Sequence, residues 1–116
     1  MASSLGEFEL VLLLAVVRLN DSAYGVTIRR AIEESTGRNV SAGAVYTALG
    51  RLEMRGLVTS TPGETVPERT GMRRRYYRVR PEGARHVQRA MRHVETMARG
   101  VMTQVVRLAA QRAKGE

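Results

Sequence analysis

The chain has 116 residues, a hydrophobic fraction of 43% and a net charge of +8, and it contains no cysteine. A chain of this length and hydrophobicity forms one domain of ordinary size with a buried core. Without cysteine there is no disulfide, no thiolate metal site and no cysteine nucleophile. The first residues show no basic segment of a signal peptide and no apolar run long enough to span a bilayer, so we expect a cytoplasmic protein without membrane contact.

The positive charge is concentrated in the second part of the chain. Residues 1–36 carry three arginines against five acidic residues, a net charge of −2, whereas residues 37–116 carry sixteen basic against six acidic residues, a net charge of +10. All but one of the basic residues are arginine, whose forked guanidinium suits phosphate and guanine. A GC-rich coding bias would also favour arginine over lysine, but it does not explain the positive excess, which predicts an anionic partner.

The first predicted element, residues 5–19, is apolar on nearly every side. A helix that is hydrophobic all round must be buried all round, yet fifteen residues are too few to cross a bilayer. One side can pack on the domain's own core, and we expect a partner subunit to cover the other side. Leu5, Phe8 and Leu12 are the residues expected at that contact.

A turn and helix cap are predicted at residues 20–22, Asn-Asp-Ser, and a helix is expected over residues 23–35. Gly37 is suited to the left-handed residue that ends such a helix. The inner side of the helix is expected to hold large side chains spaced by four, which are Tyr24, Ile28 and Ile32.

The segment 40–58, VSAGAVYTALGRLEMRGLV, predicts a short helix over residues 42–55 that Ser41 caps and Gly56 ends. An α-helix enters the major groove of DNA only if its outer face is slim enough to approach the base edges. The expected inward stripe is Val45, Leu49 and Leu52, and the outward positions are Ala42, Gly43, Tyr46, Thr47 and Gly50.

Those outward residues suit a DNA-recognition helix. Thr47 offers a hydroxyl and a methyl group to a base, Tyr46 and Ser41 can donate hydrogen bonds to phosphates, and Arg51 can reach a phosphate or a guanine. The alternative is that the glycines and alanines only permit close packing of the helix inside the domain.

A basic hairpin is predicted to follow, with strands over residues 57–61 and 75–79 and no regular structure over residues 62–72. Basic hairpins beside a recognition helix contact the DNA backbone or the minor groove, although a run of charge is often only a solvated face. Glu64 and Glu68 dilute the charge of this wing, residues 62–75. Its expected DNA contacts are Arg69, Arg73, Arg74 and Arg75.

The last predicted element is one long helix from Pro81 to about Arg112. Its apolar residues alternate steps of three and four, as in a coiled-coil seam. About thirty residues of helix span about 45 Å, which exceeds the diameter of so small a domain, so the helix must project and pair with another chain. The alternative is a helix bent at Gly100 that packs on its own domain. The seam consists of Ala84, Val87, Met91, Val94, Ala98, Val101, Val105 and Leu108.

Catalysis and metal binding have little support in the sequence. His86 and His93 are seven residues apart on the predicted helix, about 10.5 Å along its axis, which is too far to share one metal ion. No glycine-rich phosphate loop follows a predicted strand, and no Ser/His/Asp arrangement is evident. We therefore expect no enzyme activity, no metal and no cofactor.

Four segments together resemble the PadR family of bacterial transcriptional regulators, in its short form with a single C-terminal helix. They are LLAVVRL at 13–19, AYGVTI at 23–28, the segment 40–58 given above, and RRYYRV at 74–79 followed by Gly83. The resemblance implies a mainly α, three-helix winged helix-turn-helix over residues 1–80, with a two-stranded wing, and a long C-terminal dimerisation helix over residues 81–116. It also implies that Tyr46 lies in the recognition helix and that Tyr76 and Tyr77 lie on the second wing strand.

The expected function is therefore that of a sequence-specific transcriptional regulator, a repressor that binds double-stranded DNA as a homodimer. A twofold dimer predicts a pseudo-palindromic operator with half-sites about one helical turn apart or a multiple of it. The alternative is a winged helix used for protein–protein or RNA contact without specific DNA recognition. Some members of the family sense small molecules, and the sequence leaves open whether this chain has an effector.

The residues expected at the two interfaces can be stated individually. The DNA contacts are Ser41, Ala42, Gly43, Tyr46, Thr47, Arg51, Arg69, Arg73, Arg74 and Arg75. The dimer contacts are Leu5, Phe8, Leu12, Val87, Met91, Val94, Ala98, Val101, Val105 and Leu108.

Overall fold

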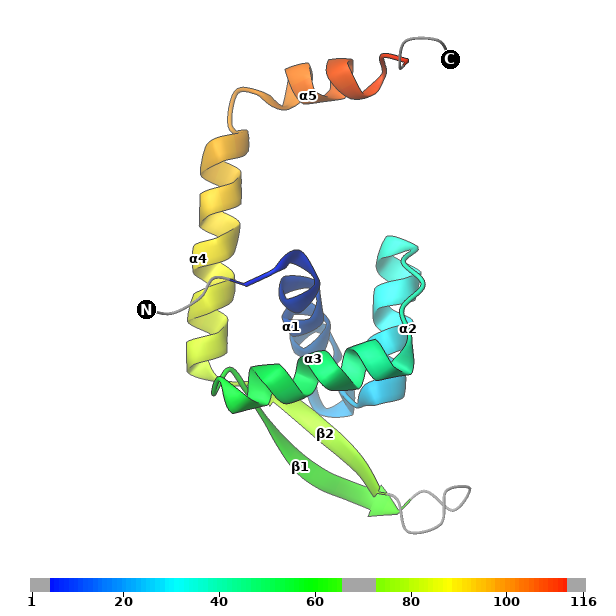
Figure 1. The fold of residues 1–116 in the computed structure, drawn as a ribbon. Helices are drawn as coiled ribbons and strands as arrows, with labels where there is room; N and C mark the ends of the chain where they lie inside the picture. Colours follow the sequence, from blue (N-terminus) through cyan, green and yellow to red (C-terminus); the bar gives the residue numbers. More distant parts are fainter. Residues whose placement is uncertain (1–4, 66–72, 113–116) are drawn as a thin grey trace.

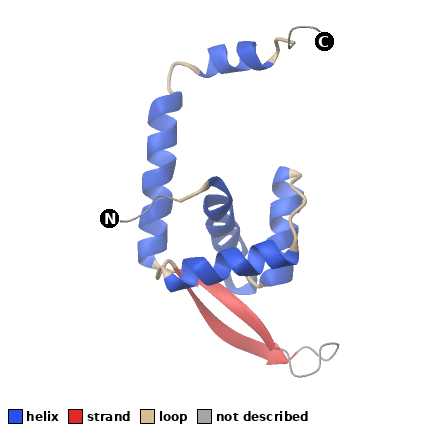
Figure 2. Cartoon of the chain, viewed as in Figure 1, coloured by secondary structure: helices blue, strands red, loops and turns tan. Residues whose placement is uncertain are grey.

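The computed structural model describes residues 5–65 and 73–112, which form five α-helices and a two-stranded antiparallel sheet (Figures 1 and 2). This arrangement confirms the predicted mainly helical winged-helix class. The elements are α1 (Glu7–Leu19), a 3₁₀ turn (Asn20–Ser22), α2 (Gly25–Thr36), α3 (Ala42–Met54), β1 (Val58–Thr65), β2 (Arg73–Val79), α4 (Pro81–Ala98) and α5 (Met102–Ala109).

The core lies where α1, α2 and α3 meet the base of the hairpin. The predicted inward stripe of α3, Val45, Leu49 and Leu52, has no exposed surface, which confirms the 3.6-residue periodicity read from the sequence. The first two helices and the start of the hairpin also contribute buried side chains. These are Leu12, Leu13 and Val16 of α1, Ile28 and Ile32 of α2, and Leu57 and Val58 at the start of β1.

Leu12 was expected at a subunit contact, and the structure corrects this. It has no exposed surface because it belongs to the side of α1 that faces the core. On the other side of α1, Leu14 is 40% and Val17 is 55% exposed. Leu5 and Phe8 are partly buried against the core. The helix is therefore apolar on both sides, as predicted, but the described residues of this chain cover only one side.

The start of α2 differs from the predicted helix over residues 23–35. Tyr24, rather than Ser22, occupies the cap position, and the Tyr24 N–H donates to Oγ1 of Thr27 at 3.0 Å. Ala23 is extended, and its carbonyl accepts the Tyr77 N–H at 2.8 Å. This bond ties β2 to the segment before α2. At the other end of the helix, Gly37 is left-handed with φ of 74°, as expected.

The hairpin is longer than predicted because β1 continues to Thr65 and β2 already begins at Arg73. The prediction of irregular structure from residue 62 onward was therefore wrong for residues 62–65. Pro62 pairs with Arg75, and the register shifts between Pro62 and Thr65. A proline is tolerated there because β1 is an outer strand, on which a backbone N–H can be missing without breaking the sheet.

The C-terminal segment is not the single helix expected over residues 81–112. It is divided into α4 and α5 at Gly100, which is left-handed with φ of 83°. A glycine adopts this conformation without steric cost, and it ends helices for that reason. The first turns of α4 contact α1 and the body, with Val87 packed on the core, and the rest of α4 and all of α5 project away as an arm (Figure 1).

A close backbone approach attaches α4 to the body. The Arg80 N–H donates to the Leu57 carbonyl at 2.9 Å. A Cβ on Gly83, in the first turn of α4, would lie 2.3 Å from that same carbonyl oxygen and 3.0 Å from Cγ1 of Val79. Any larger residue would force the helix and the hairpin apart, so the approach requires glycine.

We predict that Gly83→Ala destabilises the protein by about 1–3 kcal/mol, because the new methyl group meets backbone that cannot yield. Gly50→Ala is the control, since a Cβ on Gly50 of α3 meets nothing within 4 Å. That control should gain up to about 1 kcal/mol from helix propensity. Urea unfolding followed by circular dichroism measures both changes, and a stabilised Gly83→Ala variant would contradict the close approach.

Candidate nucleic-acid interface

The outer face of α3 is exposed and slim, as predicted. A Cβ built on Gly43 or Gly50 meets no described atom within 4 Å, so these glycines do not serve close packing inside the domain. This excludes for both of them the alternative interpretation of the small residues. The exposed positions at the cap and along this face are Ser41, Ala42, Gly43, Ala44, Tyr46, Thr47, Gly50 and Arg51.

The start of α3 is suited to an anion. Oγ of Ser41 accepts the Ala44 N–H at 3.0 Å, which is the cap predicted from the sequence. The first N–H groups of a helix have no carbonyl partner within it, and those of Ala42 and Gly43 lie at exposed residues. Together with the helix dipole, such groups favour a negative charge such as a phosphate.

Tyr46 does not extend freely from α3. Its side chain is 48% exposed, and its ring lies against Gly25, the first residue of α2. A Cβ on Gly25 would lie only 2.2 Å from Oη and 2.4 Å from Cζ of Tyr46. The ring therefore links the two helices of the helix-turn-helix, and its hydroxyl lies beside the first turn of α2. This contact could not be predicted from the sequence, in which only the glycine after Tyr24 hints at it.

Tyr77 lies beneath this surface and is 6% exposed. Burial raises the pKa of its phenol, and the charge of Glu53 and the nearby Tyr46 raise it further, while Arg75 lowers it. A neutral, buried phenol contributes to packing below the wing. It is not placed to contact a nucleic acid.

An aromatic cluster fixes the wing to the start of α2. The ring centroids of Tyr24 and Tyr76 are 5.4 Å apart, and the guanidinium carbon of Arg74 lies 4.4 Å from the centroid of Tyr24. Tyr76 in turn covers Gly63 of β1, where a Cβ would be 2.3 Å from the tyrosine ring. Tyr24 was predicted as a core residue of α2, but it is half-buried and belongs to this cluster.

A polar network joins the wing to the second half of α3. Nε and a terminal nitrogen of Arg75 donate to Oγ of Ser60 at 3.1 and 3.0 Å. Oγ of Ser60 donates to the Glu53 carboxylate at 2.8 Å. The sequence analysis did not single out Ser60 or Glu53, because the pairing of β1 with β2 is what brings them to Arg75.

The predicted basic residues of the wing therefore differ in their surroundings. Arg74 and Arg75 both contact the protein itself, and the backbone of Arg73 begins β2. Arg69 lies outside the described residues. On α3, Arg51 is exposed and forms no ion pair or side-chain hydrogen bond within the described part of the chain.

Residues 13–89 match the model of the transcriptional regulator PadR-like family. The chain belongs to this family. Its members are transcriptional regulators and not enzymes, which confirms the resemblance found in the sequence and the expectation that the chain has no enzyme activity. No curated protein sequence matches the chain.

Solved structures share this fold. A PadR-family regulator from Eggerthella lenta is 24% identical, with a TM-score of 0.64 over 82% of this chain and 80% of that one. A regulator from Clostridium thermocellum is also 24% identical, with a TM-score of 0.64 over 89% of both chains. Bacillus subtilis PadR, solved with operator DNA, is 15% identical, with a TM-score of 0.58 over 72% of this chain and 47% of that one.

The described residues were also compared with the requirements of a membrane span and of a metal site. None of the helices there is long and apolar enough to cross a membrane. Residues 5–65 and 73–112 contain no group of three or more histidine, cysteine or acidic side chains that could hold a metal ion.

We predict that Gly25→Ala and Tyr46→Ala are strongly non-additive. Alanine at position 25 should destabilise the chain that retains Tyr46 and should cost nothing once the ring is removed. Residues in contact typically couple by about 0.5–3 kcal/mol in a double-mutant cycle. Urea unfolding of the four chains of the cycle measures this coupling.

The control cycle pairs Gly25→Ala with Thr47→Ala, which alters the next residue of α3, also exposed. Its two changes should add within about 0.5 kcal/mol. Equal coupling in the two cycles would contradict the placement of the Tyr46 ring.

Proposed function

We propose that this PadR-family protein is a homodimeric repressor that binds a pseudo-palindromic operator. In each subunit α3 enters the major groove of the DNA, and the wing contacts the adjacent DNA backbone. Residues 1–80 are the DNA-binding domain, and residues from 81 onward form the dimerisation arm.

The observation that supports this proposal most directly is the outer face of α3. It is exposed, its glycines are unobstructed, and its start is capped by Ser41. A face of this width lets the helix backbone approach the base edges, where Thr47 can make a hydrogen bond or a methyl contact. Ser41, Ala42 and Gly43 are proposed to hold a phosphate at the helix start.

The wing and the arginines supply the electrostatic part of binding. The net charge of +8 favours a polyanion, and each phosphate that is neutralised makes affinity more dependent on salt. Arg51 is proposed to contact DNA directly. Arg74 stacks on Tyr24, and Arg75 binds Ser60. These two arginines are therefore proposed to hold the wing in position beside the DNA backbone, which they also face.

The dimer is supported by the apolar side chains that the arm leaves uncovered. Val94 is 59%, Met97 is 78% and Val105 is 46% exposed, although water is an unfavourable environment for them. A twofold axis through two such arms would place two copies of α3 on an inverted repeat. Repression is proposed because the family resemblance implies it, and the B. subtilis relative was solved with operator DNA.

Selection of bound duplexes from a random DNA library tests specificity. We expect one inverted repeat to be enriched, with an affinity that falls steeply as salt rises. Thr47→Ala should change the preferred base at one position of each half-site, at a cost of about 1 kcal/mol for the original base. The same substitution at Thr103, an exposed residue of α5, should leave the selected sequence unchanged.

Binding that depends on salt without any enriched sequence would refute specific operator recognition. A winged helix used for RNA or protein contact would then be the better explanation. Competition with RNA would separate those two uses.

Val94→Asp tests the dimer, because it places a charge in the proposed apolar contact. We expect the dissociation constant of the dimer to rise more than tenfold, which corresponds to about 1.4 kcal/mol. Thr96→Asp is the control, since Thr96 lies on nearly the opposite side of α4 and is also exposed. Sedimentation measures both variants, and a Val94→Asp variant that remains as dimeric as the control would contradict the proposed contact.

A further inference from the structure

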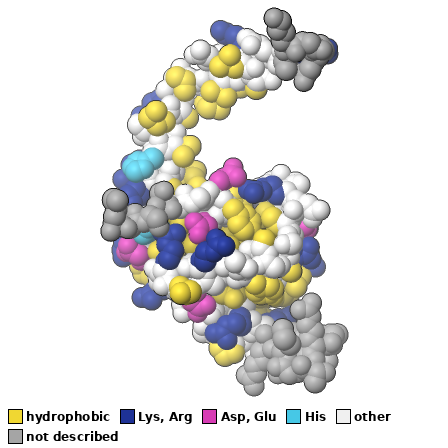
Figure 3. Space-filling model, in the orientation of Figure 1, with side chains coloured by type: hydrophobic (Ala, Val, Ile, Leu, Met, Phe, Trp, Pro, Cys, Tyr) yellow, Lys and Arg dark blue, Asp and Glu magenta, His cyan; other side chains and the backbone are white. Residues whose placement is uncertain are grey.

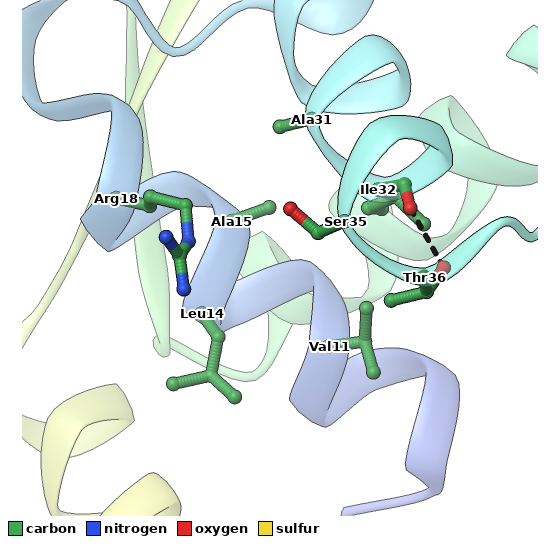
Figure 4. Close-up of a pocket in the computed structure, with 8 residues that line it drawn as sticks. All are labelled: Val11, Leu14, Ala15, Arg18, Ala31, Ile32, Ser35 and Thr36. Carbon is green, nitrogen blue, oxygen red and sulfur yellow. Dashed lines mark hydrogen bonds between the residues drawn. The ribbon is translucent and has the colours of Figure 1, made fainter.

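The surfaces of the body differ in what they offer to a polyanion. Figure 4 shows a shallow groove between α1 and α2 that is lined mostly by apolar side chains. The hydroxyl of Thr36 at its edge donates to the Ile32 carbonyl at 2.6 Å and is therefore already satisfied. Where the end of α3 meets the hairpin, Figure 3 instead shows an acidic side chain beside a basic one. The charged groups of this second surface lie beside the proposed DNA-binding face.

A short connection brings the first wing strand back against the last turn of α3. Only residues 55–57 separate α3 from β1. The Leu57 N–H donates to the Leu52 carbonyl at 2.9 Å, so the chain reverses direction without leaving the helix. Ser60 therefore lies close enough to the last turn of α3 for its Oγ to donate to the carboxylate of Glu53 at 2.8 Å.

Strand pairing brings Arg75 to the same hydroxyl. Ser60 is paired with Tyr77, and Pro62, two residues further along β1, is paired with Arg75. Alternate residues of a strand share one face, so Ser60 and Arg75 are diagonal neighbours on the face that carries the buried Tyr77. Nε and Nη2 of Arg75 donate to Oγ of Ser60 at 3.1 and 3.0 Å. A chain of hydrogen bonds thus runs from the recognition helix to the second wing strand.

The hydroxyl of Ser60 is fully used in this chain of hydrogen bonds. A serine hydroxyl has one hydrogen to donate and two lone pairs that accept. Its hydrogen is directed to Glu53, and its lone pairs accept the two N–H groups of Arg75. Because an ionised carboxylate can only accept, Glu53 fixes the direction of the hydroxyl and turns its lone pairs toward the arginine.

The guanidinium of Arg75 is held along one edge and open along the other. A guanidinium has five N–H groups in a planar fork. Ser60 accepts one from Nε and one from Nη2, which leaves the edge formed by Nη1 and Nη2. The side chain is exposed and forms no further hydrogen bond or ion pair within the described part of the chain. A free edge of this kind can bind a phosphate through two parallel hydrogen bonds.

We infer that Glu53 and Ser60 are positioning residues that hold Arg75 in place for one DNA phosphate beside α3. A long side chain that binds a ligand normally loses rotational freedom at that moment, which weakens binding. Here much of that loss has already occurred in the free protein. Because Glu53 belongs to the recognition helix, the phosphate contact is also fixed relative to the residues of α3 that face the bases. The inference rests on the proposed function, because it assigns how the wing holds DNA.

The salt dependence of DNA binding tests the contact of Arg75. The probes are the inverted repeat obtained by selection and a random-sequence duplex of the same length. Arg75→Ala should weaken binding to both by about tenfold. It should also lower the slope of log affinity against log salt by about 0.9, the value for one phosphate. Weaker binding with an unchanged slope would show that Arg75 only shapes the wing, and it would overturn the inference.

A double-mutant cycle in DNA affinity tests Ser60. Ser60→Ala should weaken binding about threefold to tenfold in the chain that retains Arg75. It should have no effect in the Arg75→Ala chain, where nothing is left to position, and Ser60→Thr, which keeps the hydroxyl, should retain the affinity. Thr59→Ala, at the exposed residue on the other face of β1, is the control and should act equally in both chains. Equal losses from Ser60→Ala in the two chains would overturn the inference.

Two substitutions of equal charge test Glu53. Glu53→Gln keeps an oxygen that can accept the Ser60 hydroxyl, whereas Glu53→Ala does not. Both remove the same negative charge, so the difference between them excludes the effect of charge on DNA binding. We expect the Glu53→Ala protein to bind both duplexes about threefold more weakly than the Glu53→Gln protein. Equal binding would overturn the role of Glu53.

The results separate this inference from the proposed function. Specific binding to an inverted repeat without coupling between Ser60 and Arg75 would overturn the inference and leave the proposed regulator intact. Coupling on the random duplex, with no inverted repeat enriched, would support the inference and contradict specific operator recognition. A protein that binds no duplex would overturn both.

Discussion

The burial of one side of α3 is the interaction on which the rest of the structure depends. Val45, Leu49 and Leu52 are completely buried against α1, α2 and the base of the hairpin, and this fixes the rotation of α3 about its axis. With that rotation fixed, the small residues of the opposite side face outward. The core therefore does not only stabilise the fold. It also determines which residues of α3 are available to a nucleic acid.

Close approaches at glycine then fix the parts around α3. Gly25 admits the ring of Tyr46, Gly63 admits the ring of Tyr76, and Gly83 lets α4 reach the Leu57 carbonyl. In each case a second element lies where a Cβ would be, so the position of that element depends on the missing side chain. The glycines on the outer side of α3 are different, because nothing in the described structure occupies the space beside them. Glycine thus permits close packing of two elements at some positions, and at others it leaves the outer face of α3 open to a nucleic acid.

Periodicity explains why much of the fold could be predicted from the sequence. The stripe of α3, the cap at Ser41 and the stop at Gly37 depend on neighbours in the chain, and all three are present. The Tyr46–Gly25 contact, the Arg74–Tyr24 stack and the link from Arg75 through Ser60 to Glu53 join residues 7 to 50 positions apart. Such contacts follow from how the elements pack, which a single sequence does not contain. The heptad pattern also continued through Gly100, where the preference of glycine for a left-handed turn prevailed over periodicity.

The bend at Gly100 changes how the apolar seam of the C-terminal segment can pair with a second copy. A straight helix could pair only along its own length with a second copy. A divided arm presents two apolar surfaces in different directions, and α5 lies beyond the ends of α1 and α2 (Figure 1). A contact between two copies along α4 therefore need not extend to α5, because the two surfaces point in different directions.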